Sequence, residues 1–456
     1  MHRSPSQPPG SFASVPWQSR LSQIDFLPRF FRLAIVNVLS NLMVPLSGLV
    51  SIAFLGHLSE IYHLTGVTIA TVLFNYIYRT LGFLRMGTTG VTAQAVGRGD
   101  RATVLLTGLR NGMLALGLGL LILLLQIPLR ELGFTLLNAS TEVRQTGQAY
   151  YDARIWGAPA TLLNFVLIGW FLGQEQGGKV LLLSVVGNGM NILLDYWLIV
   201  RLGLESTGAG LATAISQYGM AIGGLLLISR EIKWQEVKSI VSELFDPTAL
   251  RQSLVLNSNI FIRTFTFLST FTLFISLSAA MGTEILAANA LLLQIVTLAA
   301  YFIDGLAYAT ESLIGIFQGE GSKDKFLPLL GLSGATSLLV GFGLALSCAI
   351  APHQVFGLLT YHQQVLSGLS RVVLWLVPVL GFGALAFMLD GYFLGLAAGV
   401  TLRNAALLAT LIGFAPGAIV AWQLQNPDVL WLAMAMFMAA RALLLAIQVP
   451  KTLKES

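Results

Sequence analysis

Charged residues are scarce in this sequence: Asp, Glu, Lys and Arg make up 10% of its 456 residues, whereas 55% are hydrophobic. A soluble domain carries roughly 25% charged residues, which cover its surface. The deficit excludes an ordinary soluble protein. Apolar stretches of about 20 residues, long enough to cross a bilayer as a helix, recur along the whole chain. The sequence therefore predicts an all-α polytopic membrane protein.

Other absences exclude several classes of site. The single cysteine, Cys348, rules out intramolecular disulfides and cysteine-based metal sites. The histidines stand in loops or at the ends of apolar stretches and form no metal set, and no Walker A pattern occurs. ATP-driven transport and a bound cofactor are therefore not expected. The net charge of +5 comes from isolated Lys and Arg residues, so a nucleic-acid partner is not expected either.

The apolar windows predict about twelve transmembrane helices. They lie near 31–56, 63–88, 103–128, 148–173, 178–200, 206–229, 250–279, 285–314, 326–351, 366–397, 402–424 and 428–449. The longest polar interruption divides them into two halves. The predicted organisation is a cytosolic tail (1–28), an N-lobe (29–229), a cytosolic linker (230–249), a C-lobe (250–450) and a cytosolic tail (451–456).

The two halves repeat each other at an offset of 222 residues. GRGD at 97–100 corresponds to GEGS at 319–322, and GWFLG at 169–173 corresponds to GYFLG at 391–395. Six spans in each half bring both copies into the membrane from the same side, so a pseudo-two-fold axis along the membrane normal should relate the lobes. The glycines themselves also suit close helix packing, which is the alternative role for them.

Basic residues between the spans predict the orientation. With the N-terminus inside, most loop and tail Lys and Arg residues lie in the cytosol, and only Arg130, Arg144, Arg201 and Arg371 lie outside. This asymmetry follows the positive-inside rule. An even number of spans then places both termini in the cytosol, in a multi-pass protein of the plasma (inner) membrane.

Short segments distributed along nearly the whole chain carry a family resemblance. They are VPLSGLV (44–50), GHL (56–58), FLRMGTTG (83–90), AQA (93–95), Asn188, NILLD (191–195), GAGLAT (208–213), IDGLAYATE (303–311), LDG (389–391) and RN (403–404). In these the chain resembles the MATE (multidrug and toxic compound extrusion) exporters, and within them the DinF-like branch. The resemblance implies a transporter. It also implies an aspartate in the first span for cation coupling, but Ser51 holds that place, and Asn259 stands where relatives often have an acid.

The N-lobe candidates for cation coupling centre on Asp195. Asn191 and Asn188 precede it by one and almost two helical turns, so the three share a helix face. Further polar side chains are expected at a similar depth: Asn164, Thr213 and Ser51. Such oxygens suit a proton relay or a hard cation such as Na⁺. The alternative is a set of hydrogen bonds that only holds the helices together. Because Ser51 leaves a single carboxylate, a Na⁺ site should be weak, and H⁺ is the preferred coupling ion.

The C-lobe candidates for substrate binding are Asp304, Asp390 and Arg263. Neutralisation of one acid by Arg263 would leave the other free to titrate or to attract a cationic substrate; an inert ion pair is the alternative. Glu311 and Arg85 are expected near cytosolic helix ends, where they would gate or anchor the helices.

Together these features predict a monomeric secondary exporter that moves small, cationic, amphipathic organic compounds out through the lipid bilayer. Alternating access of the two lobes, driven by an H⁺ or less favourably a Na⁺ gradient, would supply the mechanism. A lipid-linked precursor flippase of the same architecture is one alternative. It should have a cationic central region, whereas Arg263, Arg441 and Arg79 look scattered along the sequence. An intramembrane enzyme is the other, but no catalytic dyad is visible.

Overall fold

The computed structural model describes residues 25–58, 60–136, 140–357, 369 and 372–454. Most of the predicted N-terminal tail and the first residues of the predicted tenth span lie outside this part of the chain. Within it, helices and their connections account for the fold, and no strand occurs. Twelve helices are long and apolar enough to cross a membrane. The predicted all-α polytopic fold is confirmed.

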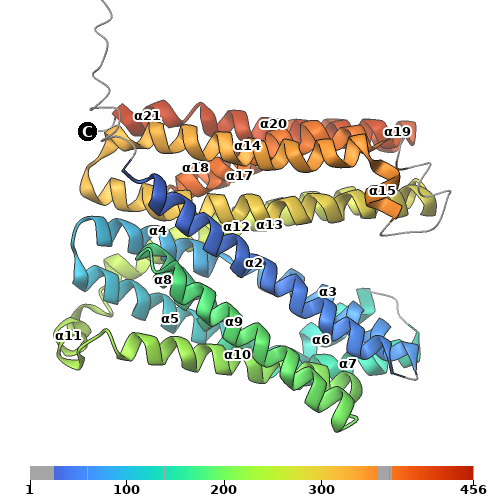
Figure 1. The fold of residues 1–456 in the computed structure, drawn as a ribbon, viewed down its shortest axis with the longest axis horizontal. Helices are drawn as coiled ribbons and strands as arrows, with labels where there is room; N and C mark the ends of the chain where they lie inside the picture. Colours follow the sequence, from blue (N-terminus) through green and yellow to red (C-terminus); the bar gives the residue numbers. More distant parts are fainter. Residues whose placement is uncertain (1–24, 59, 137–139, 358–368, 370–371, 455–456) are drawn as a thin grey trace, which may run out of the picture.

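The first six spans form the N-lobe, in the lower half of Figure 1. Its helices are α2 (Leu27–Gly56), α3 (Ile61–Thr80), α4 (Phe83–Gly97), α5 (Arg101–Leu124), α6 (Gln126–Leu136), α7 (Thr141–Arg154), α8 (Ala158–Gly173), α9 (Gly177–Asp195) and α10 (Glu205–Ser229). The pairs α3–α4 and α7–α8 each form one continuous span.

The last six spans form the C-lobe, in the upper half of Figure 1. After the linker helix α11 (Trp234–Ile240), its helices are α12 (Pro247–Ala280), α13 (Thr283–Glu320), α14 (Phe326–Ile350), α15 (Pro352–Gly357), α17 (Leu376–Gly395), α18 (Gly399–Leu408), α19 (Ala415–Leu424), α20 (Pro427–Ala446) and α21 (Val449–Lys454). A π-helical turn over Ala409–Phe414 joins α18 to α19 in one span.

Several predicted boundaries are wrong. The second span continues past residue 88 to Gly97, and the fourth begins at Thr141 rather than at 148. The third span ends at Leu124, and the separate helix α6 follows it. Apolar residues among the polar ones of α6 extended the predicted third span beyond Leu124, so the sequence did not reveal the break between the two helices. The region expected to be a C-terminal tail is largely helical, because α21 reaches Lys454.

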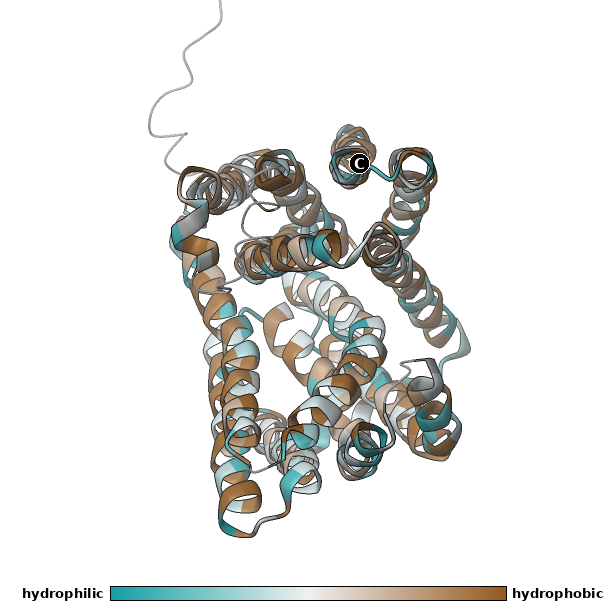
Figure 2. Cartoon of the chain, turned by 90° about the vertical axis from the view of Figure 1, so that its right-hand side faces the viewer, coloured by the Kyte–Doolittle hydropathy of each residue, from teal (hydrophilic) through white to brown (hydrophobic). Residues whose placement is uncertain are grey.

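The outer helix faces are apolar, as a lipid environment requires. Large hydrophobic side chains that the protein leaves exposed include Leu49, Leu193, Leu339 and Leu411. Figure 2, seen from the right of Figure 1, shows hydrophobic residues along helices of both lobes. Contact with water would oppose exposure of this much apolar surface, whereas contact with hydrocarbon would not. The described chain is therefore an integral multi-pass membrane protein.

The repeated glycines allow corresponding helices to touch. A Cβ atom on Gly169 of α8 would overlap the backbone oxygen of Arg85 in α4, and one on Gly391 of α17 would overlap that of Ala307 in α13. Both contacts are related by the 222-residue offset. The glycines therefore serve close helix packing in each lobe, and the duplication seen in the sequence is present in three dimensions.

The two lobes touch where α4 crosses α13. A Cβ on Gly97 would lie 2.9 Å from the Cα of Gly319, and one on Gly319 would lie 2.9 Å from the Cα of Gly97. These residues are 222 positions apart, so the pseudo-two-fold axis passes between them. Gln94 adds a hydrogen bond across the lobes, from its Nε2 to the oxygen of Gly395 at 2.9 Å.

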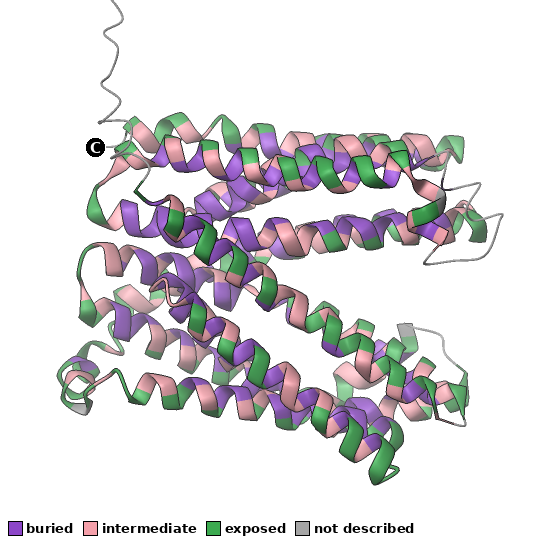
Figure 3. Ribbon diagram, in the orientation of Figure 1, coloured by how far each residue is buried: buried purple, intermediate pink, exposed green. Residues whose placement is uncertain are grey.

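The lobes meet at one end of the molecule and diverge toward the other (Figure 1). We call the end where α4 crosses α13 the closed end, on the left of Figure 1, and the opposite one the open end. α2 begins and α21 ends at the closed end, where the linker helix α11 also lies. Figure 3 shows buried residues inside both lobes, and α13 is buried almost continuously between Gly305 and Phe317, the part of the helix that approaches the closed end.

The glycine crossing should be sensitive to a single methyl group. Gly97→Ala would force its Cβ into the backbone of α13, and overpacking of this kind costs about 1–3 kcal/mol. We expect a lower thermal unfolding midpoint in detergent than for Gly117→Ala in α5, where nothing lies within 4 Å of the added atom. Equal midpoints for the two variants would contradict the proposed role of the crossing.

Candidate functional site

The N-lobe polar cluster consists of Ser47 and Ser51 of α2, Asn191 and Asp195 of α9, and Thr213 of α10. Ser51 Oγ donates a hydrogen bond to Asp195 Oδ2. One turn away, Ser47 Oγ donates to Asn191 Oδ1 at 2.7 Å, and Asn191 Nδ2 donates to Thr213 Oγ1 at 3.5 Å. Residues four apart on α2 therefore bond to residues four apart on α9, as neighbouring turns of two packed helices allow.

Asp195 is completely buried within the protein. Its second oxygen, Oδ1, has no hydrogen-bond partner among the described residues. No lysine, arginine or histidine of the described chain forms an ion pair with it. Burial of an ionised carboxylate without a compensating charge is costly. The arrangement is therefore suited to a carboxyl group that takes up and gives off a cation or a proton.

Two predicted members of this group donate hydrogen bonds to other partners. Asn164 of α8 donates from Nδ2 to the backbone and side-chain oxygens of Gln217 in α10, both at 2.9 Å. Asn188 donates to the backbone oxygen of Ser184. Ser47, which the sequence analysis did not single out, takes a direct place in the cluster instead. Its position four residues before Ser51 was the available signal.

The C-lobe charge cluster is built on Asp390 of α17. Arg263 of α12 and Arg441 of α20 both donate to its Oδ2 atom. All three residues are buried. The guanidinium of Arg441 also lies 4.8 Å from the ring centre of Phe267 and 5.5 Å from that of Phe387, within cation–π range. This cluster of two arginines and one carboxylate ties α12, α17 and α20 together.

The expectation that the deep arginines are scattered is wrong for two of them. Arg263 and Arg441 lie far apart in the sequence but converge on the same carboxylate. Asp390 was expected to pair with Arg263 alone or to stay free, and it is held from two sides. By contrast, Asp304 of α13 is half-buried and has no hydrogen bond or ion pair with another described residue. Arg85, Arg263 and Arg79 interact with Asp304 electrostatically, but none of them forms a direct pair with it.

A second buried ion pair spans the two lobes. Arg85 of α4 lies 3.6 Å from Oε2 of Glu311 in α13, and both side chains are buried. Arg85 also lies 3.7 Å from the ring centre of Tyr308. Because these contacts cross from the N-lobe to the C-lobe, they must change whenever the lobes separate at the closed end. Both residues lie inside their spans, Ile61–Gly97 and Thr283–Glu320, rather than near the helix ends as expected, and their gating or anchoring role stays a prediction.

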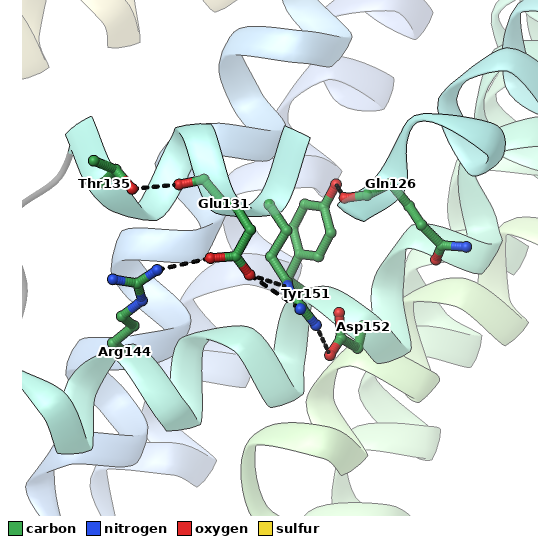
Figure 4. Close-up of polar contacts among 7 residues, drawn as sticks. Gln126, Glu131, Thr135, Arg144, Tyr151 and Asp152 are labelled. Carbon is green, nitrogen blue, oxygen red and sulfur yellow. Dashed lines mark hydrogen bonds and ion pairs between the residues drawn. The ribbon is translucent and has the colours of Figure 1, made fainter. Parts of the chain in front are cut away.

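An exposed ion network fixes α6 to α7 at the open end (Figure 4). Arg130 contacts Glu131 at 3.0 Å and Asp152 at 2.7 Å, and Arg144 contacts Glu131 at 2.8 Å. Tyr151 donates to the backbone oxygen of Gln126. Exposed pairs contribute little individually, but a network of this kind can hold a short helix at a membrane surface. Among the described residues no group of three or more His, Cys, Asp or Glu side chains is placed to hold a metal ion.

Comparisons with known proteins agree with this architecture. The family model described as MatE matches the chain twice, over residues 37–197 and 260–421. The chain is 34% identical to DNA damage-inducible protein F of Escherichia coli over 91% of its own length and 90% of that protein's. It is 27% identical to a probable multidrug resistance protein NorM of Synechococcus, covering 80% and 79% of the two chains.

Solved structures share the fold at lower sequence identity. A multidrug resistance MATE family transporter of the MOP superfamily, in an outward-facing conformation, superposes with a TM-score of 0.84 at 20% identity. That match covers 94% of this chain and 96% of the other. A MOP superfamily transporter from Pyrococcus furiosus, whose binding pocket is described as having reverse polarity, gives 0.83 at 20% identity over 93% and 95%.

Removal of the carboxylate at the centre of the C-lobe cluster should destabilise the protein. Asp390→Asn leaves two buried arginines without a counter-charge, and breaking a buried pair in this way costs about 3–5 kcal/mol. We expect a clearly lower unfolding midpoint. Asp304→Asn, which removes an acid without a direct partner, is the matched control and should unfold near the wild-type temperature. If both variants unfold alike, the two arginines do not depend on Asp390.

Proposed function

This chain belongs to the MatE family of multidrug and toxic compound efflux transporters, and we propose that an H⁺ gradient drives its export of organic compounds through Asp195. The observation that carries the proposal is the environment of this carboxylate. It is buried, has one hydrogen-bond donor from Ser51, and no basic side chain of the described chain pairs with it. A proton is the smallest species that can neutralise it without a wider ligand set.

The surroundings of Asp195 provide few oxygen ligands for Na⁺, whereas a proton needs only the carboxylate itself. Hard cations prefer several oxygen ligands. Around Asp195 the second family carboxylate is replaced by Ser51, and Asn191 already uses its oxygen for Ser47. Asn164 and Asn188 donate from their amide nitrogens to partners outside the cluster, and the buried Asn164 oxygen has no described hydrogen-bond partner. The Ser51 substitution and the use of the Asn191 oxygen by Ser47 support H⁺ over Na⁺ as the coupling ion.

The proton would act by changing the hydrogen bonding between α2 and α9. Ionised Asp195 only accepts hydrogen bonds, and Ser51 supplies one. The protonated acid carries its own donor, so its preferred partner becomes an acceptor, such as a backbone oxygen of a neighbouring turn. α2 also contacts α13 of the C-lobe, where Asn41 donates to the backbone oxygen of Tyr301. A shift of α2 against α9 can therefore alter the contact between the lobes.

The C-lobe would attract the substrate. Asp390 is paired with two arginines, whereas Asp304 has no direct partner among the described residues, so we assign a cationic and amphipathic compound to Asp304. Movement of one charge across 100 mV supplies about 2.3 kcal/mol, which an ion-coupled cycle can use for transport. We propose that a monomer is sufficient, because each lobe contributes one of the two sites.

The coupling role predicts a specific transport defect. Asp195→Asn keeps the size of the side chain but cannot take up a proton. In proteoliposomes with an imposed pH gradient, export of a fluorescent organic cation should fall to the level of empty liposomes, while the unfolding midpoint stays within a few degrees. Asp152→Asn, which removes an exposed N-lobe acid at the open end, is the control and should transport normally.

The opposite pattern would refute the proton assignment. Transport by the unmodified protein that requires a Na⁺ gradient and ignores the pH gradient would show that Na⁺ is the coupling ion. Wild-type transport by Asp195→Asn would make the N-lobe polar cluster a structural element.

We further propose that the closed end faces the cytosol of a cell whose plasma (inner) membrane holds the protein. Both described ends of the chain and α11 lie at this end, and most loop lysines and arginines should lie there by the positive-inside rule. A single cysteine introduced at exposed Lys238 in α11 should react with an impermeant thiol reagent only after the cells are opened. The native Cys348 is buried and should add little background. Labelling in intact cells would contradict this proposal and place the closed end outside the cell.

A further inference from the structure

The two lobes make the same tight turn at the closed end. In the N-lobe, Glu175 follows α8 with a φ of 57°, and in the C-lobe Ala397 follows α17 with a φ of 54°. Their amides donate to the backbone oxygens of Leu172 and Leu394, at 3.0 and 2.9 Å. Glu175 and Ala397 are 222 positions apart, so they are equivalent residues of the duplicated fold.

In the N-lobe this turn holds an ion pair. Arg29, in the first turns of α2, donates from Nε and one terminal nitrogen to the two carboxylate oxygens of Glu175, at 3.1 and 2.5 Å. A two-pronged pair of this kind is strong and directional. The carboxylate thus neutralises the arginine where α2 passes the turn.

In the C-lobe the arginine is kept and the carboxylate is missing. Arg251, in the first turns of α12, is the equivalent of Arg29 by the same offset, and Ala397 replaces Glu175. Arg251 is exposed and forms no hydrogen bond or ion pair with another described residue. Next to it lies a cavity of about 430 Å³ between α12 and the turn that precedes α18. Its lining includes Thr248, Arg251, Gln252, Asn259 and Ala397.

A second arginine borders the cavity. Arg403 of α18 donates from a terminal nitrogen to Oδ1 of Asn259, which lines the cavity, at 2.8 Å. Its equivalent in the N-lobe is Leu181, so this positive charge belongs to the C-lobe alone. No aspartate or glutamate lines the cavity. The N-lobe site holds one positive and one negative charge, whereas the C-lobe site has two positive charges and no carboxylate.

Apolar surface adjoins these charges. Val255 and Val400 line the cavity and each exposes about half of its surface, 51% and 50%. Leu254, which is also 51% exposed, lies beside Val255 on α12, and Phe261 and Phe265, 37% and 45% exposed, continue the apolar surface of this helix away from the closed end. A molecule that fills the site would place an anionic group against Arg251 at the closed end and a hydrocarbon chain along this face.

We propose that the cavity binds an anionic phospholipid, whose phosphate group takes the place that the Glu175 carboxylate occupies in the N-lobe. Arginine pairs with a phosphate through the same two-pronged geometry that it uses with a carboxylate. Basic pockets between transmembrane helices are suited to such headgroups. A free phosphate would use the arginines but leave the apolar wall unoccupied, so the lipid is the occupant that fits the whole site. The inference does not depend on the coupling ion or the substrate.

Native mass spectrometry of the full-length protein with added phosphatidylglycerol or phosphatidylcholine tests the proposal. We expect wild type to retain one phosphatidylglycerol in preference to phosphatidylcholine. Ala397→Glu should pair with Arg251 as Glu175 does with Arg29, and the backbone already tolerates glutamate at this φ in the N-lobe. This variant and Arg251→Gln should each weaken retention about five- to tenfold, the effect expected from one arginine–lipid contact.

The control is Arg230→Gln, which lowers the net charge by one at an exposed position beyond α10 and should leave retention unchanged. An equal loss in this variant would show a non-specific charge effect and overturn the proposal. Unchanged retention in Ala397→Glu and Arg251→Gln would also overturn it. Displacement of phosphatidylglycerol by millimolar inorganic phosphate would show that the site recognises a free anion, against the lipid assignment.

Discussion

The close crossing of α4 and α13 at Gly97 and Gly319 is the constraint on which the arrangement of the lobes depends. Each glycine lies against the backbone of the other helix, and the two are related by the pseudo-two-fold axis. Because neither residue has a side chain, the helices touch at the closed end, and the lobes can diverge from this point toward the open end. Within each lobe, Gly169 and Gly391 set the neighbouring contacts in the same way, so α4 and α13 are each held between a partner in their own lobe and each other.

The spans, the duplication and the N-lobe carboxylate could be predicted because each depends on local or periodic information. Apolar length predicts spans, a constant offset predicts repeats, and Asn191 and Asp195 share a helix face at a spacing of four. The pairing of Arg441 with Asp390 could not be predicted, since the residues are 51 positions apart and nothing in the sequence fixes how α17 and α20 pack. α6 was missed because its apolar residues continue the window of the preceding span. Asn164 was expected at the depth of Asp195, but an expected depth does not fix a partner, which is Gln217.

The two lobes share the same backbone features but differ in the charges of their side chains. Both lobes have the same turn with a positive φ, the same glycine contacts, and an arginine at the start of the first helix. Yet the buried acid of the N-lobe cluster has only hydroxyl and amide neighbours, whereas Asp390 in the C-lobe is held by two arginines. Under the mechanism that we propose, the N-lobe thus holds a carboxylate that takes up a proton, whereas the C-lobe holds, at a position that is not equivalent, a carboxylate paired with two arginines. An exporter benefits from this division, because a titrating site and a substrate site that share one carboxylate would compete.

The buried ion pair between the lobes also affects how the lobes can separate. The Arg85–Glu311 pair crosses between lobes, so separation of the lobes at the closed end must either break it or carry both groups to new partners. A broken buried pair costs several kcal/mol, which is more than the roughly 2.3 kcal/mol from one charge crossing 100 mV. If alternating access opens the closed end, as we propose, water or substrate would therefore have to compensate Arg85 and Glu311. Asp304 lies seven residues before Glu311 on α13 and already interacts electrostatically with Arg85, so a substrate that takes Asp304 as its partner would also change the charge balance around this pair.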